Sequence, residues 1–393
     1  MSSKLHVMAV FGTRPEAIKM APVVRVLGEN PEIRATCVVT AQHREMLDQV
    51  LELFGLQPQV DLDIMRANQS LAGITSRVLE GLSPVLERDR PDALLVQGDT
   101  STAFAAGLAA CYHKVPVGHI EAGLRTADRY DPFPEEMNRR LLTRIAEMQF
   151  APTAWARQNL LEEGIPAEDI YLTGNTVTDA LRLILEKLPP GPPQDLVRLE
   201  PGQRMLLVET HRRENLGAPM QEICQALVHL VQEFPDVALV FSVHRNPRVR
   251  EVVIPALQGR ERIHLLEPVS YPDLVRLMRH AHLILTDSGG IQEEAPSLGV
   301  PVLVLRRTTE RPEGIQSGNA RLVGTESPAI RREAARLLQD AEHYRAMSQA
   351  ASPYGDGQAA RRTVEALLHR FGRLASRPEE FAPSHLKVCR DRR

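Results

Sequence analysis

Short apolar runs rich in β-branched residues alternate with longer amphipathic stretches along most of the chain. Each run is about as long as one strand, and each stretch between runs is long enough for a helix. Because two parallel strands need a crossover connection, this alternation predicts parallel sheets covered by helices. The expected strands lie at 5–11, 33–41, 91–99, 115–123 and 149–153, and again at 204–210, 237–243, 262–266, 282–287 and 300–305.

The proline-rich stretch PPGPPQDL at 189–196 interrupts the alternation, which then starts again. A chain of 393 residues is long enough for two domains. We therefore predict two Rossmann-like doubly wound α/β domains that face a cleft. The first spans residues 1–175 plus 360–376, because the loop SPYGDGQAA at 352–360 returns the last helix to it. The second spans 176–359, and a tail at 377–393 is expected to be disordered.

Composition excludes several classes of protein. The net charge is −3 with acids and bases interspersed, which argues against a dedicated nucleic-acid or membrane partner. No apolar stretch is as long as a membrane span, and the first residues lack the pattern of a signal peptide. The four cysteines are far apart, so disulfides and structural zinc are not expected. A cytoplasmic location is the expectation that follows.

Acidic residues stand at the ends of neighbouring strands in the first half. Asp99 ends one strand and Glu121 lies in the next, within a nearly apolar run where a carboxylate is partly desolvated. If these strands are neighbours, their backbones lie about 5 Å apart at one sheet edge. Glu135 follows a proline-stiffened approach. The alternatives are a helix cap for Asp99 and a first-turn glutamate for Glu135. Together the three acids indicate acid–base chemistry.

The first strand ends in FGTRPEAIK, which is not a dinucleotide fingerprint. Gly12 would let the backbone approach a ligand, while Arg14 supplies a planar cation and Lys19 lies about one turn into the helix that follows. The alternative is an ordinary turn with a solvated arginine.

Cations stand at the strand ends of the second half. His211, Arg212 and Arg213 follow one strand, and Arg311 belongs to a charged segment after another. The stretch SGGIQEEAPSLG at 288–299 reads as a strand-to-helix turn whose N–H groups suit an anion. Its carboxylates either complement the helix dipole or hold another part of a bound ligand. These features fit a diphosphate-linked ligand.

The motifs together resemble those of the non-hydrolysing UDP-N-acetylglucosamine 2-epimerases. The resemblance covers roughly residues 4 to 370. It is carried by FGTRPEAIKMAPVV, TAQHREMLDQVL, QGDTSTA, HIEAGLRT, PFPEEMNRR, THRREN, TDSGGIQEEAPSLGVPVLVLRRTTERPE and SPYGDGQA. It implies a GT-B fold, a homodimer, and interconversion of UDP-GlcNAc and UDP-ManNAc that feeds cell-surface polysaccharide synthesis.

The resemblance also implies roles for individual residues. The catalytic set is Asp99, Glu121, Glu135 and His211, and the substrate-binding set is Arg14, Ser288, Gly289, Gly290, Glu294 and Arg311, to which we add Lys19 and Arg212 from their positions at the strand ends. The glycines would hold the diphosphate and Glu294 the ribose, while Glu293 would remain a surface acid at the helix dipole. Since the phosphate partners are arginines, His211 and backbone N–H groups, we predict no metal and no other cofactor.

Some members of this family bind a second UDP-GlcNAc beside the active site. Gln42 and His43 resemble part of that regulatory site, whereas Glu45 stands where such members often carry glutamine. The family's chemistry breaks the C1–O bond to UDP, so that the C2 proton can leave and 2-acetamidoglucal forms. Three alternatives remain: a retaining glycosyltransferase, a hydrolysing epimerase and a catalytically silent nucleotide-sugar sensor.

Overall fold

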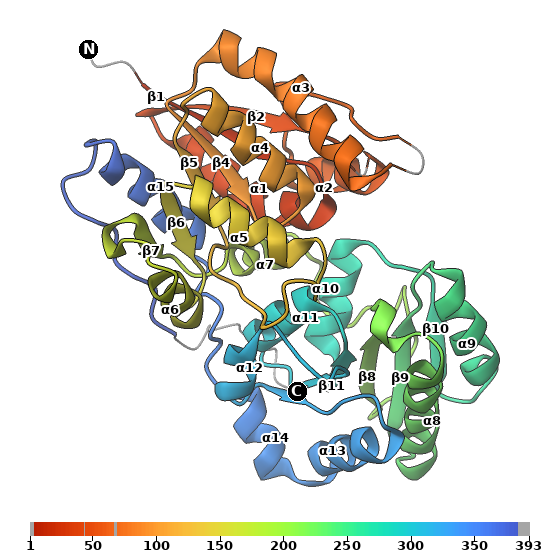
Figure 1. Cartoon of the computed structure of the whole chain (residues 1–393). Coiled ribbons are helices and arrows are strands. Elements are labelled where there is room, and N and C mark those ends of the chain that lie inside the picture. Colours follow the sequence, from red (N-terminus) through yellow and green to blue (C-terminus); the bar gives the residue numbers. More distant parts are fainter. Residues whose placement is uncertain (1–3, 43, 67–68, 384–393) are drawn as a thin grey trace. The chain divides into compact units, whose positions relative to one another are not determined.

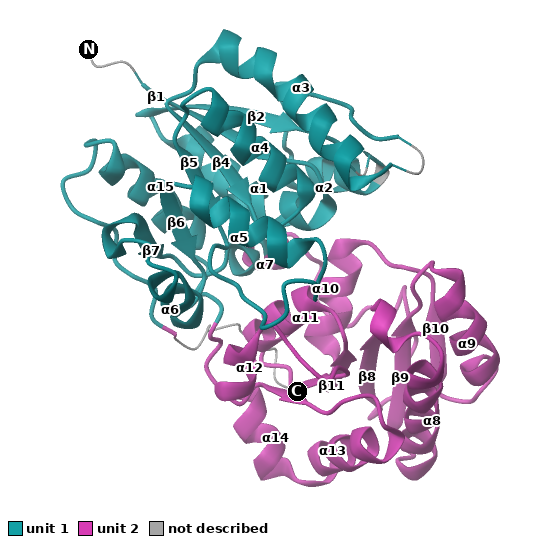
Figure 2. Cartoon of the chain, in the orientation of Figure 1, with its two compact units in different colours: residues 1–180, 354–382 teal, residues 181–353, 383–393 magenta. Residues whose placement is uncertain are grey.

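A computed structural model describes residues 4–42, 44–66 and 69–383 of the chain. It divides into two compact units, residues 1–180 with 354–382 and residues 181–353 with 383–393 (Figure 2). The divisions between the units fall after residues 180 and 353, whereas the sequence analysis predicts them after residues 175 and 359. Helix α7 (Thr176–Leu185) runs through the first division.

The first unit contains a parallel sheet. Within the described residues it has seven strands in the order β3-β2-β1-β4-β5-β6-β7. Their bounds are β1 (Leu5–Phe11), β2 (Ile33–Val39), β3 (Val60–Asp61), β4 (Ala93–Gln97), β5 (Val117–Ile120), β6 (Met148–Ala151) and β7 (Ile170–Leu172). Strands β4 and β5 are neighbours, with Gln97 paired to Ile120, so the predicted adjacency of the Asp99 and Glu121 strand ends is confirmed.

Helices pack against this sheet (Figure 1). They are α1 (Arg14–Glu29), α2 (Arg44–Phe54), α3 (Leu71–Asp89), α4 (Ser101–Tyr112), α5 (Glu135–Ile145), α6 (Ala154–Glu162), the first part of α7, and α15 (Ala359–Arg370). Pro15 stands in the first turn of α1, where its missing N–H costs no hydrogen bond. Helix α15 packs against α1, so the last helix does return to the first unit.

The second unit repeats the architecture. Its sheet has six parallel strands among the described residues, in the order β10-β9-β8-β11-β12-β13. The strands are β8 (Arg204–Glu209), β9 (Val237–Ser242), β10 (Ile263–Leu266), β11 (Leu283–Thr286), β12 (Val302–Val304) and β13 (Ala320–Leu322). The helices are α8 (Ala218–Glu233), α9 (Pro247–Leu257), α10 (Tyr271–His280), α11 (Gly289–Glu294), α12 (Pro312–Gln316), α13 (Ser327–Gln339) and α14 (Ala341–Ser348). The predicted fold class, two Rossmann-like α/β domains, is confirmed.

The segment from 377 to 382 differs from the disordered tail that the sequence suggests. Phe381 is 3% exposed, and its N–H donates to the carbonyl of Leu172 in β7 at 2.9 Å. The guanidinium of Arg377 lies 4.3 Å from the centre of the Tyr171 ring. An aromatic anchor and a cation–π contact therefore hold this segment on the edge strand. Residues 384–393 lie outside the described residues.

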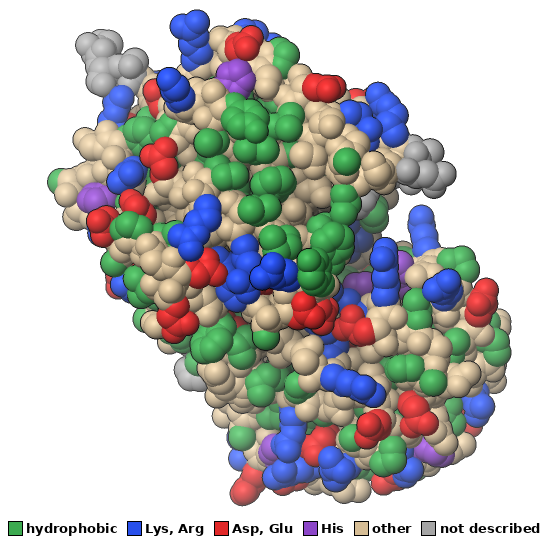
Figure 3. Space-filling model, viewed as in Figure 1, with side chains coloured by type: hydrophobic (Ala, Val, Ile, Leu, Met, Phe, Trp, Pro, Cys, Tyr) green, Lys and Arg blue, Asp and Glu red, His purple; other side chains and the backbone are tan. Residues whose placement is uncertain are grey.

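Charged side chains of both signs are interspersed over the face that Figure 3 displays. Within the described parts of the chain, no helix is both long and apolar enough to cross a membrane.

Candidate active site

Glu121 follows β5 directly and is 8% exposed. Its carboxylate is held by three side chains. Lys19 Nζ lies 2.5 Å from Oε1 and Asn175 Nδ2 lies 3.2 Å from Oε1, while Gln97 Nε2 donates to Oε2. The backbone of Glu121 has φ +66°, a left-handed conformation that is uncommon outside glycine and recurs at functional sites. Glu121 and Lys19, which the sequence analysis predicted separately, therefore form a buried ion pair.

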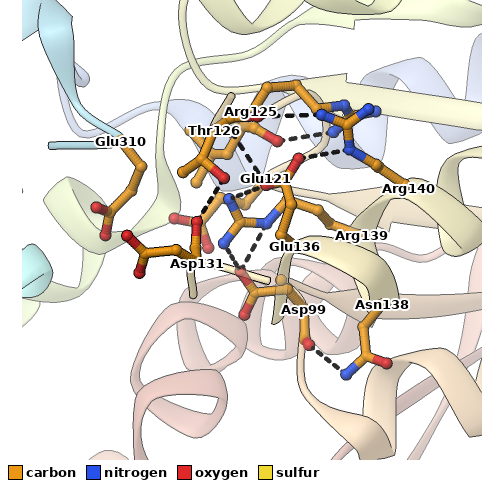
Figure 4. A network of polar contacts seen from close by, with 12 residues as sticks. Asp99, Glu121, Arg125, Thr126, Asp131, Glu136, Asn138, Arg139, Arg140 and Glu310 are labelled. Carbon is orange, nitrogen blue, oxygen red and sulfur yellow. Dashed lines mark hydrogen bonds and ion pairs between the residues drawn. The ribbon is translucent and has the colours of Figure 1, made fainter. Parts of the chain in front are cut away.

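Asp99 does not cap the helix that follows it. The cap of α4 is Thr100, whose side chain accepts from the N–H of Ala103. Asp99 Oδ2 instead accepts from Arg139 Nη2 at 2.6 Å and Nε at 3.0 Å (Figure 4). Asn138 also donates to the Asp99 carbonyl at 2.9 Å. The carboxylate is thus oriented by a charged, two-point contact that a capping role does not need.

Glu135 begins α5 and is half-buried. Its neighbour Glu136, which the sequence analysis did not single out, is fully buried. Glu136 accepts from Arg139 Nη1 at 3.1 Å and from Arg140 Nε at 2.6 Å. Arg139 therefore links Glu136 to Asp99 (Figure 4). The first turns of α5 thus carry both Glu135, a predicted acid, and Arg139, which supports Asp99.

Glu16, also missed from the sequence, is a buried acid at the start of α1. Its Oε2 accepts from the N–H groups of Gly12 at 3.0 Å and Thr13 at 2.7 Å, and its Oε1 accepts from the Thr100 hydroxyl at 2.6 Å. Burial raises the pKa of Glu16 to about 7, although these hydrogen bonds lower it. The T-x-x-E spacing of a capping box was the sequence signal for this residue. Arg14, the first residue of α1, is half-exposed beside it.

The predicted ligand-binding residues of the second unit follow three adjacent strands: His211 and Arg212 follow β8, Ser288 follows β11 and Arg311 follows β12. Strands β8 and β11 pair in register, Glu209 with Thr286, so that His211 and Ser288 lie at the same edge. Asp287, which is fully buried, accepts from the N–H groups of His211 at 3.0 Å and Arg212 at 3.1 Å. This aspartate, missed from the sequence, fastens the two loops together.

His211 is placed by Glu209, whose Oε1 lies 2.8 Å from Nδ1. Burial lowers the pKa of His211, but the hydrogen bond to Glu209 and the charges of Glu209 and Asp287 outweigh it. The pKa therefore lies above its ordinary value. A raised pKa favours the cation, which suits a partner for phosphate. His244 stacks on the ring, with centroids 5.6 Å apart.

Helix α11 begins at Gly289 with Ser288 as its cap residue. Arg311 Nε donates to Glu293 Oε1 at 2.7 Å, and Arg311 Nη1 also bonds to Glu310. Glu293 is only 1% exposed, so the expectation of a surface acid is wrong: it anchors Arg311. Glu294, the predicted ribose contact, is 7% exposed on the same helix.

Arginines surround Glu310. Burial raises the pKa of Glu310, but the charges of Arg311, Arg306 and Arg212 lower it further, so it lies well below its ordinary range. Arg212 Nη2 lies 3.5 Å from Glu310 Oε1, and Arg306 Nη1 lies 2.7 Å from Oε2. Arg306 also pairs with Glu214 and Arg311 with Glu293, so these carboxylates hold the three guanidinium groups in place beside the glycine turn.

The ligand atoms of Glu209, His211 and Asp287 lie within 4.8 Å of one another, a spacing that could accommodate a metal ion. However, the Asp287 carboxylate already accepts from His211, Arg212 and the amide of Asn215, and Glu209 is bonded to His211. These contacts use the lone pairs that a cation would need, so the cluster fits a hydrogen-bonded support better than a metal centre.

Of the predicted regulatory residues, Gln42 accepts from the Thr102 hydroxyl at 2.9 Å, and its carbonyl accepts from Gln69 at 3.3 Å. His43 and the side chain of Glu45 lie outside the described residues.

Known proteins match this chain along nearly its whole length. The family model described as UDP-N-acetylglucosamine 2-epimerase matches residues 25–368. The UDP-N-acetylglucosamine 2-epimerase of Bacillus subtilis is 51% identical over 378 residues, 96% of this chain and 99% of that protein. The protein of the same name from Escherichia coli K12 is 52% identical over 372 residues, 92% of this chain and 98% of that protein.

A solved structure supports the same relationship. The UDP-GlcNAc 2-epimerase of Neisseria meningitidis, bound to UDP-GlcNAc, has a TM-score of 0.89 and 48% identity, covering 93% of this chain and all of that one. The fold of the present chain and the residue clusters at its strand ends define an enzyme of the GT-B type. The chain belongs to the UDP-N-acetylglucosamine 2-epimerase family, a family of isomerases.

Proposed function

We propose that this enzyme interconverts UDP-GlcNAc and UDP-ManNAc by inverting C2 of the sugar. The observation that carries the proposal is the buried carboxylate of Glu121, which Lys19, Gln97 and Asn175 hold. The backbone of Glu121 is strained, and the residue lies at the same sheet edge as Asp99. Relatives that share about half of their residues with this chain are named UDP-N-acetylglucosamine 2-epimerase, and the structure of one relative contains bound UDP-GlcNAc.

The proposed route begins with breakage of the C1–O bond, whose electron pair leaves with UDP. Positive character at C1 then acidifies the C2 proton, which passes to a carboxylate as the C1=C2 double bond of 2-acetamidoglucal forms. A proton returns to C2 from the opposite face, and the UDP oxygen adds back to C1. Atoms and electrons balance without a metal or a redox cofactor.

Proton transfer at C2 is assigned to Glu121 together with Asp99 and Glu135, without dividing the roles among them. The Lys19 ammonium beside Glu121 stabilises its ionised form, which a proton acceptor needs. Arg139 holds the Asp99 carboxylate in one orientation by two N–H contacts. Two oriented carboxylates at one sheet edge can supply both the proton acceptor and the proton donor that this chemistry needs.

The UDP moiety is assigned to the second unit, with Arg14 of the first as a further cation. The N–H groups of Gly289 and Gly290, in the turn that begins at Ser288, would take the diphosphate, with His211, Arg212 and Arg311 offsetting the charge that develops as UDP departs. Glu294 would accept hydrogen bonds from the ribose hydroxyls.

Proton NMR of UDP-GlcNAc incubated with the pure enzyme in D2O tests the proposal. We expect UDP-ManNAc with deuterium at C2, and slow leakage of UDP and 2-acetamidoglucal. A glycosyltransferase would leave C2 unlabelled, a hydrolysing epimerase would release free ManNAc, and a silent sensor would bind without turnover. Retention of protium at C2 over many turnovers would overturn the elimination route.

Four further statements remain predictions: a role in polysaccharide synthesis, a cytoplasmic location, a homodimer, and activation by a second UDP-GlcNAc near Gln42, His43 and Glu45. Light scattering after size exclusion tests the dimer. A rate that rises more steeply than hyperbolically with UDP-GlcNAc would support activation.

A further inference from the structure

Asn175 lies where α7 begins and is 3% exposed. Its Oδ1 accepts from the N–H of Val177 at 3.1 Å, the contact of a helix cap, and its Nδ2 donates to Glu121 Oε1 at 3.2 Å. Because Oδ1 must face the N–H of Val177, the NH2 group is the end that faces Glu121. Asn175 can therefore only donate to this carboxylate.

The backbone of Asn175 is fixed as firmly as its side chain. Its N–H donates to the carbonyl of Tyr354 at 2.6 Å, and its carbonyl accepts from the Thr178 hydroxyl at 2.8 Å. A Cβ on Gly355 would come within 2.2 Å of Thr178 Oγ1 and 3.1 Å of the Asn175 carbonyl, so the returning chain packs tightly on this turn. The chain leaves the first unit after residue 180 and re-enters it at residue 354, where the Tyr354 carbonyl accepts the Asn175 N–H.

Glu121 needs such support. Its left-handed backbone carries a strain that the surroundings must hold, and a carboxylate that exchanges a proton must keep one orientation. The Lys19 ammonium is a charged donor to Glu121 Oε1. The Asn175 amide is an uncharged donor to the same oxygen, and it belongs to a rigid turn.

We propose that Asn175 is a positioning residue for the C2 chemistry: its amide fixes the Glu121 carboxylate and favours its ionised form. This inference rests on the proposed function. The competing explanation is that Asn175 only caps α7. Ser caps helices about as well as Asn, so capping alone predicts that Asn175→Ser is nearly neutral, whereas Asn175→Asp brings a like charge beside Glu121 under either explanation.

The test compares Asn175→Asp and Asn175→Ser with wild type. Asp keeps the acceptor for Val177 but turns a negative oxygen toward Glu121, and Ser keeps an acceptor but lacks the amide donor. We expect kcat to fall about tenfold or more with little change in UDP affinity by calorimetry. In Asn175→Asp the acidic limb of the kcat–pH profile should move to higher pH, because a like charge disfavours ionised Glu121.

Asn159→Asp is the matched control, since Asn159 Nδ2 donates at 2.9 Å to the carbonyl of Gly123, two residues from Glu121. It should leave the acidic limb in place. Wild-type kcat and an unmoved acidic limb in both Asn175 variants would overturn the inference. The ¹³C resonance of the Glu121 carboxyl, assigned through Glu121→Gln, gives a second readout. Its titration midpoint should rise in Asn175→Asp, and a midpoint equal to wild type would also overturn the inference, even if the wild-type enzyme failed to epimerise UDP-GlcNAc.

Discussion

The guanidinium of Arg311 lies directly against Gly289. A Cβ added at Gly289 would come within 2.6 Å of Arg311 Nη1 and 2.7 Å of its Cζ, closer than side-chain carbons approach in proteins. Arg311 is held by Glu293 and Glu310, so it cannot turn aside without breaking buried ion pairs. Glycine at 289 is therefore required by the arginine as well as by any ligand.

Gly289→Ala should consequently lower the melting temperature of the ligand-free enzyme by several degrees and weaken UDP binding about tenfold or more. Gly290→Ala is the matched control for stability. A Cβ there meets nothing nearer than Glu294 Oε1 at 3.7 Å, and alanine is the better helix former. Thermal unfolding and calorimetry with UDP measure both effects. Equal melting temperatures in the two variants would contradict the proposed constraint.

Glu121→Gln should reduce epimerisation by a factor on the order of 10² or more, because glutamine keeps the shape but cannot accept a proton. UDP binding should survive, since its assigned residues other than Arg14 lie in the second unit. Rates from NMR and UDP affinity from calorimetry separate the two. A fully active Glu121→Gln enzyme would show that the C2 proton goes elsewhere.

Much of the fold could be predicted because alternating hydrophobicity marks buried parallel strands directly. The parts that were missed lack that signal. Helix α3 contains Gly81 and Pro84, which normally break helices, yet tertiary packing keeps it continuous. Strands β3 and β13 are two and three residues long, too short to show a period.

The candidate site divides in the same way. Asp99 and Glu121 could be placed together because neighbouring parallel strands end at one edge. Their supports could not be found, since Arg139 lies 40 positions from Asp99 and Asn175 lies 54 from Glu121. Whether an arginine such as Arg139 pairs with a site acid or with solvent depends on packing that no local pattern records. Glu293 was misjudged for this reason, since its partner Arg311 is 18 positions away.

Glu16 should make stability depend on pH. Its pKa of about 7 in the fold exceeds the ordinary 4.5, so the folded state binds the proton more tightly than the unfolded state. The contribution of Glu16 to stability is therefore greatest at low pH and falls as pH rises from about 4.5 to 7, by roughly 3 kcal/mol for the full displacement. Glu16→Gln abolishes this term. Urea unfolding should show the variant gaining on wild type between pH 5 and 8, whereas Glu29→Gln, on the exposed end of the same helix, should not.

Chelation should leave activity unchanged. The carboxylate of Asp287 is fully buried and accepts from His211, Arg212 and Asn215, so a cation would have to displace these donors. Turnover is compared before and after incubation with EDTA and removal of the chelate. Loss of activity that magnesium restores would mean that a metal carries part of the diphosphate's charge.

The basic limb of the pH–rate profile should follow His211. Glu209 and Asp287 hold the pKa of His211 above its ordinary value despite burial, so the imidazolium persists to higher pH than in a free histidine. If that cation stabilises the departing diphosphate, kcat falls as pH rises through this pKa. Glu209→Gln removes the nearer charge, at 2.8 Å from Nδ1, and the basic limb should move to lower pH. Glu261→Gln, an exposed change in the same unit, should leave it in place. A basic limb that stays fixed in Glu209→Gln would assign it to another group and remove His211 from the role proposed for it.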